Sequence, residues 1–388
     1  MTANPTNPVN TPGPVNGIFA TFTAAQGGQA VSAENNWFGC NAGPSAAPCD
    51  TVGIDNLVDA NPWLVMEASL ASGSIANPGS TTVTASIKKN STPASAGPVP
   101  VGTPASFAST NTWVASVAPA SSNTNGSGDA TSTVNAEDNG ATSITATIDA
   151  QTFTLPLTVT GTSTRYVATT GNNNGGANNC KDNLNPCLTV QHAINRAGAG
   201  DTIEIANGNY PENSIALNKD LTIHGASEAG TVVGPTTGSV NQNIFVLGDS
   251  ADGATLSNLT VSSRASGSFG AIRAFDAGIG ASIDNVDLTG ITVTGLSSST
   301  SYGVSFGTAA SGWDLDDVTI TKFISGIDNR AATVTNTTIT NSLFTDNQNG
   351  IYVTANMSVI PNTNLFDGLT VTDTTFNNNH ETGVYFEG

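Results

Sequence analysis

The C-terminal part of the chain repeats one pattern of apolar and polar positions. A short β-branched strand is followed by a glycine and an apolar-x-apolar step, as in NGIYV from Asn349 and TGVYF from Thr382. The glycines of these steps recur at two spacings, one short and one long: Gly270, Gly303, Gly326, Gly350 and Gly383. A period of about 23 residues, lengthened by about ten where a loop is inserted, is typical of one coil of a stacked repeat.

This period predicts a parallel β-helix over residues 163–388. One coil cannot bury its own apolar side, so we expect successive coils to stack and to line up Val, Ile, Leu and Phe inside. Phe306, Phe323, Phe344 and Phe376 fall at inward positions. Glycines permit tight corners, and Asn or Asp at the bends tolerates the left-handed conformation. A leucine-rich repeat is the competing prediction, but the sequence lacks its Leu-x-x-Leu-x-Leu signature.

A short helix precedes the repeats. Four apolar residues have the i, i+3, i+4, i+7 spacing of one helix face: Val190, Ala193, Ile194 and Ala197. Thr189 is suited to begin the helix and Gly198 to end it. We expect this helix to cover the otherwise open first coil, whose unpaired strand edges favour aggregation.

The residues around this helix resemble a known family. YVATTGNNNGGANNCKDNLNPCLTVQHAINRAGAGDTIEIANGNYPEN, from Tyr166, and the following LTIHGAS, from Leu221, resemble the first coil of pectate-lyase-like (pectin lyase superfamily) β-helix proteins. The resemblance implies a right-handed parallel β-helix with a helical cap at its start.

Residues 66–162 have a different pattern, with short alternating strands at even spacing. The strands are TTVTASI, TWVASVA, DATSTVNA, TSITATID and FTLPLTVTG, and turn residues such as Asp138-Asn139-Gly140 separate them. This pattern predicts a β-sandwich. It resembles bacterial immunoglobulin-like domains, which occur in tandem on surface proteins. We expect Trp113 to fill the core of this domain.

Residues 1–65 complete the predicted all-β organisation. AENNWFGCNAGPSAAPCD, from Ala33, and VDANPWLV, from Val58, resemble the last coil and exit of a pectate-lyase-like β-helix, and GIFATFTAAQ, from Gly17, has the pattern of one more coil. The expected order is therefore the terminal coils of a β-helix, an immunoglobulin-like β-sandwich, and a parallel β-helix with its helical cap.

This order predicts an assembly edge. The last coil ends on Val384, Tyr385 and Phe386 without a capping segment, and the complementary N-terminal side carries Ile18, Phe19, Trp37 and Trp63. We expect the N-terminal segment of one copy to complete the β-helix of the next. The copies are either repeats of a very long chain or separate chains joined head to tail. Closure of the edge by the chain's own N-terminal segment and an arbitrary chain boundary are the alternatives.

The four cysteines form two close pairs, Cys40 with Cys49 and Cys180 with Cys187. Four cysteines allow three connectivities, but the short intervening loops favour local pairing. Zinc sites use tighter spacing, usually with histidines. Two disulfides imply an oxidising compartment, so we expect an extracellular, cell-surface protein.

Charge narrows the range of partners. The chain has 10 Lys and Arg against 29 Asp and Glu, a formal net charge of -19. Such a surface repels nucleic acid and anionic lipid. The sequence has no run of about 18 apolar residues, so we expect no membrane insertion. We therefore expect other copies of the chain as the main partner, and a surface glycan as the second.

The sequence has no recognisable catalytic constellation, so we expect no enzymatic activity and no cofactor. Asp314, Asp316 and Asp317 are weak candidates for calcium ligands, and a solvated corner is the alternative interpretation. Pectate-lyase-type and galacturonase-type catalysis requires clustered carboxylates. The predicted function is that of an extracellular structural or adhesive protein, a repeat or subunit of a surface filament. A polysaccharide-active β-helix enzyme or a carbohydrate-binding adhesin is the alternative.

Overall fold

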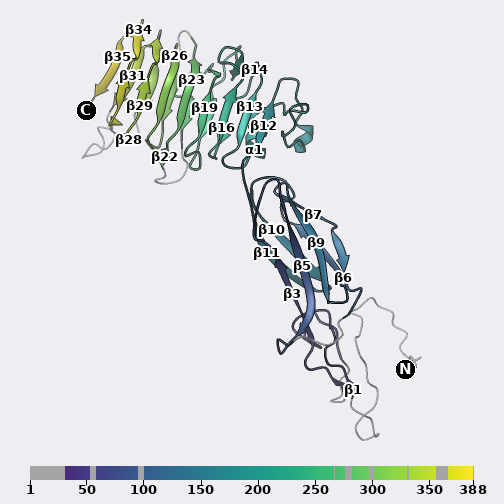
Figure 1. The fold of residues 1–388 in the computed structure, drawn as a ribbon. Helices are drawn as coiled ribbons and strands as arrows, with labels where there is room; N and C mark the ends of the chain where they lie inside the picture. The colour runs from purple at the N-terminus through teal and green to yellow at the C-terminus, as the bar shows by residue number, and fades with distance from the viewer. Residues whose placement is uncertain are drawn as a thin grey trace. The chain divides into compact units, whose positions relative to one another are not determined.

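The computed structural model describes residues 31–52, 58–94, 100–265, 267–275, 282–296, 301–329, 332–354 and 366–387. The candidate edge residues Ile18 and Phe19 lie outside this range. The chain divides into two compact units, Met1–Gly161 and Thr162–Gly388, here called the N-terminal and C-terminal units (Figure 1). Both are built from β-strands, and none of the described helices is long and apolar enough to cross a membrane. The three-domain division stays a prediction.

Two sheets form most of the N-terminal unit. One is antiparallel, in the order β3 (Leu64–Leu70), β5 (Ser80–Asn90), β9 (Asp129–Ala136) and β7 (Ala115–Ala118). The other runs β4 (Ser74–Ala76), β11 (Gln151–Thr160), β10 (Gly140–Ile148), β6 (Pro104–Ser109) and β8 (Ser121–Asn123), with β4 and β11 parallel. Alternate residues of both sheets, such as Val83 and Ile144, share one buried core. Alternating apolar positions therefore produce two sheets packed face to face.

The prediction for Trp113 is wrong. Its side chain is 41% exposed, and the neighbouring Val114 is buried in the core instead. The side chain of Asn111 accepts a hydrogen bond from the Trp113 amide at 3.1 Å, and the chain enters β7 from this turn. Trp113 and Val114 thus lie in the turn and not in the strand, so strand alternation does not decide which of them points inward.

The C-terminal unit is a stack of coils whose strands form parallel rows, here called the coil stack (Figure 1). The first row is β12 (Thr164–Val167), β13 (Thr202–Ile205), β16 (Thr222–Gly225), β19 (Thr255–Ser257), β23 (Asp287–Thr294), β26 (Asp314–Thr321), β29 (Thr338–Thr340) and β33 (Thr370–Thr372). The second row is β14 (Gly208–Tyr210), β17 (Thr231–Val233), β20 (Thr260–Ser262), the second halves of β23 and β26, β30 (Leu343–Thr345) and β34 (Thr375–Asn377). Each coil therefore repeats the path of the one before it.

Two further parallel rows complete the coils. The third row is β15 (Ile215–Leu217), β18 (Phe245–Leu247), β21 (Gly270–Ala274), β24 (Tyr302–Phe306), β27 (Ser325–Asn329), β31 (Asn349–Thr354) and β35 (Thr382–Glu387). The fourth row is β22 (Ser282–Asp284), β25 (Ala309–Ser311), β28 (Val334–Thr335) and β32 (Phe366–Asp367). Repeating glycine steps thus give an all-β unit with long parallel sheets.

Apolar side chains stack inside the coils in register. Along the third row, Val304 pairs with Ile327, Ile327 with Ile351, and Ile351 with Val384. The rings of Phe344 and Phe376 stack with centroids 5.1 Å apart. The inward positions predicted for the phenylalanines are confirmed, since Phe306, Phe323 and Phe344 are buried and Phe376 packs against the same core.

In five successive coils, from β19 to β34, a single residue in the left-handed conformation forms the bend between the first two rows. The φ angles are 56°, 59°, 54°, 49° and 49° at Asn258, Gly290, Asp317, Asn341 and Asp373. Asn, Asp and Gly are the residues that adopt this conformation at least cost. The expectation that Asn and Asp occupy the bends is confirmed, and the bends keep consecutive strands of one coil on different faces.

Candidate functional site

The first coil is covered by the helix α1 (Val190–Arg196). Val190, Ala193 and Ile194 are buried against the coil, and the Thr189 side chain accepts a hydrogen bond from the His192 amide at 3.3 Å. These contacts confirm the predicted helix, its apolar face and Thr189 as its N-cap, whereas the C-cap is Ala197 and not the predicted Gly198. The start of the coil stack is therefore sealed by the chain itself.

Two charged side chains from later in the chain hold the ends of α1. The Glu212 carboxylate accepts hydrogen bonds from the amides of Val190 and Gln191, at 2.7 and 3.0 Å. Burial raises the pKa of Glu212, and these two hydrogen bonds oppose the rise. At the other end, Lys219 Nζ donates to the carbonyls of Ile194 and Ala197, at 2.9 and 2.6 Å. Both charges have the sign that the helix dipole favours at their end.

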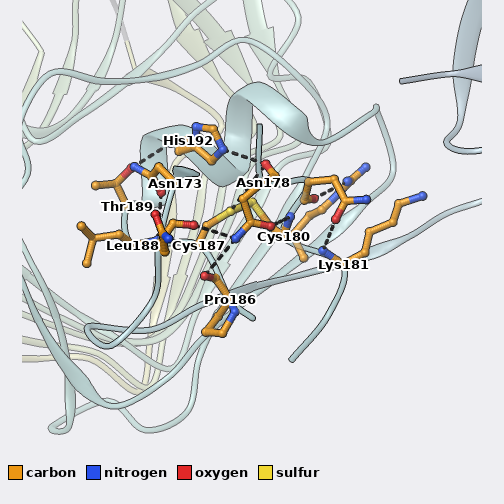
Figure 2. Close-up of a disulfide and its surroundings, with 12 residues drawn as sticks. Asn173, Asn178, Cys180, Lys181, Pro186, Cys187, Leu188, Thr189 and His192 are labelled. Carbon is orange, nitrogen blue, oxygen red and sulfur yellow. Dashed lines mark hydrogen bonds between the residues drawn. A yellow bond between two sulfur atoms is a disulfide. The ribbon is translucent and has the colours of Figure 1, made fainter. Parts of the chain in front are cut away.

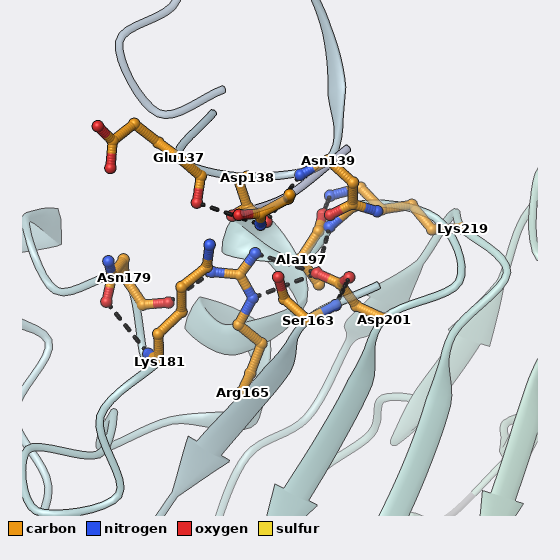
Figure 3. A network of polar contacts seen from close by, with 12 residues as sticks. Glu137, Asp138, Asn139, Ser163, Arg165, Asn179, Lys181, Ala197, Asp201 and Lys219 are labelled. Atoms are coloured by element: carbon orange, nitrogen blue, oxygen red, sulfur yellow. Dashed lines mark hydrogen bonds and ion pairs between the residues drawn. The ribbon is translucent and has the colours of Figure 1, made fainter. Parts of the chain in front are cut away.

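A buried ion pair lies under the same coil (Figure 3). Arg165 Nη2 is 3.0 Å from Asp201 Oδ2, and both side chains are fully buried. The Asp201 carboxylate also accepts from the amides of Ser163 and Gly198, and Arg165 Nη1 donates to the Asn179 carbonyl at 2.7 Å. The sequence analysis missed this pair. The signal was the alternation of the strand TRYV, which places Arg165 on the same inward side as Val167.

A disulfide closes the loop in front of α1 (Figure 2). Cys180 and Cys187 are bonded and fully buried. The Asn178 side chain donates to the carbonyls of Asn172, Asn185 and Pro186, at 2.6, 3.0 and 3.1 Å. The loop is thus held from both sides. Cys40 and Cys49 form the second disulfide, so both local pairings agree with the sequence.

One potential metal cluster occurs among the described residues. Ligand atoms of Cys180, Cys187 and His192 lie within 4.8 Å of one another. The two sulfurs are bonded to each other, and His192 Nε2 lies 2.8 Å from the Asn178 carbonyl oxygen. This cluster therefore serves as a crosslink.

The far end of the coil stack is formed by its last described strands and is here called the open end. Among the described strands, β32, β33, β34 and β35 each pair on one side, with β28, β29, β30 and β31 respectively. Val384 is 42% exposed and Phe386 is 54% exposed, although Ile351 and Val353, which precede them in the same rows, are buried. The open end therefore presents both strand edges and apolar side chains.

Asparagine side chains form a ladder of hydrogen bonds between successive coils near this end. Asn347 Nδ2 donates to the Ile320 carbonyl at 2.9 Å, and its Oδ1 accepts from the Phe323 amide at 3.0 Å. One coil later, Asn379 Nδ2 donates to the Phe344 carbonyl and its Oδ1 accepts from the Asn347 amide, at 3.0 and 3.2 Å. Among the described residues, Asn379 is the last member of this ladder.

Among the described residues of the N-terminal unit, one pair of strands has the spacing of a coil. β1 (Val31–Ser32) is parallel to β2 (Val58–Asp59), with Val31 opposite Val58. Phe245 and Ile272, which are successive partners in the third row of the coil stack, have the same separation along the chain. Parallel pairing at this separation is the pattern of one coil beside the next.

Trp37 and Trp63 fix this segment to the two sheets of the N-terminal unit. Trp37 Nε1 donates to Asp149 Oδ2 at 2.6 Å, and its ring packs against the core of the sheets. Trp63 Nε1 donates to the Asn41 carbonyl at 3.1 Å, and Asn41 Oδ1 accepts from the Met66 amide at 2.6 Å. Both tryptophans thus hold the segment that contains β1 and β2 against the sheets of the N-terminal unit.

The three acidic candidates lie on the outer side of β26. Asp316 Oδ1 accepts from Thr340 Oγ1 and Asn341 Nδ2 of the next coil, at 2.7 and 2.8 Å, and these hydrogen bonds lower the pKa of Asp316. Asp317 forms a left-handed bend. Asp314 pairs in register with Asp287, whose pKa is raised by burial and then by the Asp314 charge. The structure does not gather the three carboxylates into one cluster, and calcium binding stays a prediction.

A groove of about 280 Å³ lies on the outer side of the third row. It is lined by Ser268, Arg273, Tyr302, Ser305, Phe306, Gly307 and Asp328. Arg273, Ser305 and Asp328 follow one another in register across three coils. The groove thus combines one cation, one carboxylate and a tyrosine ring.

No protein-family model matches the chain, and no curated protein matches its sequence. Among solved structures, domains 4 and 5 of the S-layer protein SbsC are 23% identical, covering 27% of this chain and 56% of that chain, with a TM-score of 0.21. The D00-D0 domain of Intimin is 24% identical, covering 29% and 55%, with a TM-score of 0.22. Rhamnogalacturonan lyase is 15% identical, covering 58% and 53%, with a TM-score of 0.28. The chain spans little more than half of each, and similarities of this size do not identify a function.

Proposed function

We propose that this chain is an extracellular structural protein with a surface-adhesive role, whose copies join end to end. The N-terminal segment of one copy completes the coil stack of the next. The copies are either separate chains or repeats within a longer chain. The finer fold belongs to the same proposal: a right-handed parallel β-helix of the pectate-lyase-like kind and an immunoglobulin-like module.

The observation that carries the proposal is the match between an open end and a coil-spaced strand pair. The last described coil has strands paired on one side, and Val384 and Phe386 at its edge are exposed. The β1–β2 pair is parallel and joins Val31 to Val58, so the N-terminal segment follows the same geometry. Strand addition joins such edges through main-chain hydrogen bonds.

The anchoring of the N-terminal segment supports the same conclusion. Trp37, Asn41 and Trp63 tie the segment to the sheets that follow it. A coil stack completed by this segment is therefore connected firmly to the next pair of sheets. Rigid coils and packed sheets then alternate along the assembly.

An extracellular location is supported by the two disulfides, because such bonds persist in oxidising compartments. The net charge of -19 disfavours binding to nucleic acid and to anionic lipid surfaces.

Analytical ultracentrifugation at increasing concentration tests the proposal. The full-length protein should form species that grow with concentration, and filaments should appear in electron micrographs. Val384→Lys should abolish growth and leave thermal unfolding unchanged, because the edge side chain is exposed. Leu184→Lys is the matched control, since Leu184 is 90% exposed in the disulfide loop and away from the edge. A protein that stays monomeric at every concentration contradicts end-to-end joining.

Glycan binding is a second candidate function, favoured by the groove on the third row. Arg273, Ser305 and Asp328 offer hydrogen bonds beside the ring of Tyr302. Titration with polysaccharide fragments, followed by calorimetry, should give binding that Arg273→Ala removes. No heat of binding with any acidic or neutral glycan contradicts this candidate.

The absence of enzymatic activity is also part of the proposal. Acid–base cleavage of a glycosidic bond normally uses two carboxylates flanking the bond. The residues lining the groove include one carboxylate, Asp328, and one cation, Arg273. Depolymerisation of pectic polysaccharides by the purified protein contradicts this part.

A further inference from the structure

A column of glycines runs along the third row of the coil stack, and each glycine leaves space for the next coil. A Cβ added to Gly303 would lie 2.5 Å from the Gly326 carbonyl oxygen. On Gly326 it would lie 2.6 Å from the Gly350 oxygen, and on Gly350 it would lie 2.4 Å from the Gly383 oxygen. Real Cβ atoms do not come this close, so the carbonyl of the following coil requires a glycine at each position. A side chain of the interior, Ile320, Phe344 or Phe376, also approaches the same space.

Gly383 continues the column, but the atoms around its Cβ position differ from those around the earlier glycines. The nearest atoms to its Cβ position belong to Phe376, the closest at 3.2 Å, and no carbonyl of a described residue stands where the earlier coils have one. Gly383 has no positive φ that would favour glycine by itself. The last glycine of the column therefore fits a backbone carbonyl that a further coil would bring.

The N-terminal segment contains the matching sequence. Asn16-Gly17-Ile18-Phe19 repeats the order amide, glycine, aliphatic, aromatic of Asn349-Gly350-Ile351-Tyr352 in β31. In β31 the glycine belongs to the column, the isoleucine is buried, and the tyrosine ring stacks on Tyr385 with centroids 5.1 Å apart. The four residues thus carry each feature that the third row repeats.

We propose that residues 16–20 of a second copy pair in parallel with β35, with Gly17 opposite Gly383, Ile18 opposite Val384 and Phe19 opposite Tyr385. This register rests on the proposed end-to-end function and specifies its contact. Ile18 covers the exposed Val384, and Phe19 extends the stack of Tyr352 and Tyr385. A shift of two residues would place Asn16 opposite Val384 in the apolar row, and a shift of one would turn Ile18 outward.

Cysteine crosslinking tests the register. Neighbouring strands lie about 4.8 Å apart, within the Cα distances that a disulfide spans. The full-length Phe19→Cys/Tyr385→Cys variant should form a ladder of multimers on a non-reducing gel. Thr21→Cys/Tyr385→Cys, shifted by two residues, is the matched control and should remain unlinked. Each single variant is first checked for unchanged thermal unfolding.

The possible outcomes distinguish failure of the proposed register from failure of the proposed end-to-end function. Multimers that crosslink through the shifted pair, or through neither pair, overturn the register and leave end-to-end joining intact. Failure to form multimers in ultracentrifugation overturns both.

A glycine comparison gives a second readout. Gly383→Ala should destabilise the separated copy less than Gly350→Ala does, since its methyl group meets only Phe376, at 3.2 Å. It should weaken association at least about tenfold, because the methyl group would meet the incoming carbonyl. Gly350→Ala should destabilise the separated copy itself, since that carbonyl is already present. Unchanged association of Gly383→Ala contradicts the register.

Discussion

The two ends of the coil stack differ in how their apolar interior and strand edges are covered. At the start, α1 covers the apolar interior, and Glu212 and Lys219 satisfy the polar groups at the helix ends. At the far end, the strands stay paired on one side, and Val384 and Phe386 are exposed. Uncovered strand edges favour association, so this contrast between the described ends supports the proposed directional joining. The predictions below test this contrast.

The largest expected loss of stability comes from a substitution at the sealed end, where α1 covers the first coil. Asp201→Ala leaves Arg165 buried without its carboxylate and should lower the free energy of unfolding of the C-terminal unit by about 3–5 kcal/mol. Urea unfolding followed by the fluorescence of the buried Trp313 measures it. The double variant Arg165→Met/Asp201→Leu removes both charges and should lose less. An equal loss in the double variant would show that the pair is not the cause.

The next largest loss of stability is expected in the interior of the third row, where Ile351 and Val384 can be compared. Ile351→Ala creates a cavity in the interior and should cost about 2–5 kcal/mol of unfolding free energy. Val384→Ala, one coil further at the open end, should change the stability of the separated copy by less than about 0.5 kcal/mol. Chemical unfolding at low protein concentration checks both. A similar loss at the two positions would mean that the last coil is already covered.

The disulfide in front of α1 contributes a smaller effect. Cys180→Ser/Cys187→Ser removes a short-range crosslink and should cost about 2 kcal/mol. The melting temperature of the C-terminal unit should fall, and end-to-end association measured below that temperature should remain. Loss of association in the folded variant would contradict the separation of the two ends.

The smallest effect is the pH dependence contributed by Glu212. Burial raises its folded-state pKa, so the stability that it contributes is fully present below the ordinary glutamate pKa and is lost as pH rises through the folded value. Glu212→Gln stays neutral and lacks this dependence. The unfolding free energy of wild type relative to the variant should therefore decrease from about pH 4 upward. A difference that stays constant with pH would exclude this contribution.

Local patterns predict much of the C-terminal unit. The spacing of Val190, Ala193 and Ile194 gives α1, and the glycine period gives the rows of strands. These features depend on neighbours in sequence or on a recurring local pattern, so the sequence contains them directly. The left-handed bends follow in the same way, since few residue types accept that conformation.

Features that depend on distant contacts escape the sequence. The exposed position of Trp113 follows from the turn at Asn111, and the anchoring of Trp37 depends on Asp149, which is far away along the chain. The clamp on α1 by Glu212 and Lys219 likewise joins residues that no local pattern connects. For the candidate site, the edge residues of β35 could be anticipated, but the asparagine ladder required the hydrogen bonds of Asn347 and Asn379.

The one-residue bends also bear on how such a chain can diversify. Asn258, Gly290, Asp317, Asn341 and Asp373 each turn the backbone within a single position. In these five coils this corner keeps one length, whereas the earlier corner between β16 and β17 is longer. Residues gained or lost in a coil leave the strand register intact. In the third row, the stretch of chain from Ile351 to Val384 is longer than the stretch from Ile327 to Ile351, yet both pairs align. New surface features can thus be acquired by insertion without disturbing the shared cross-section.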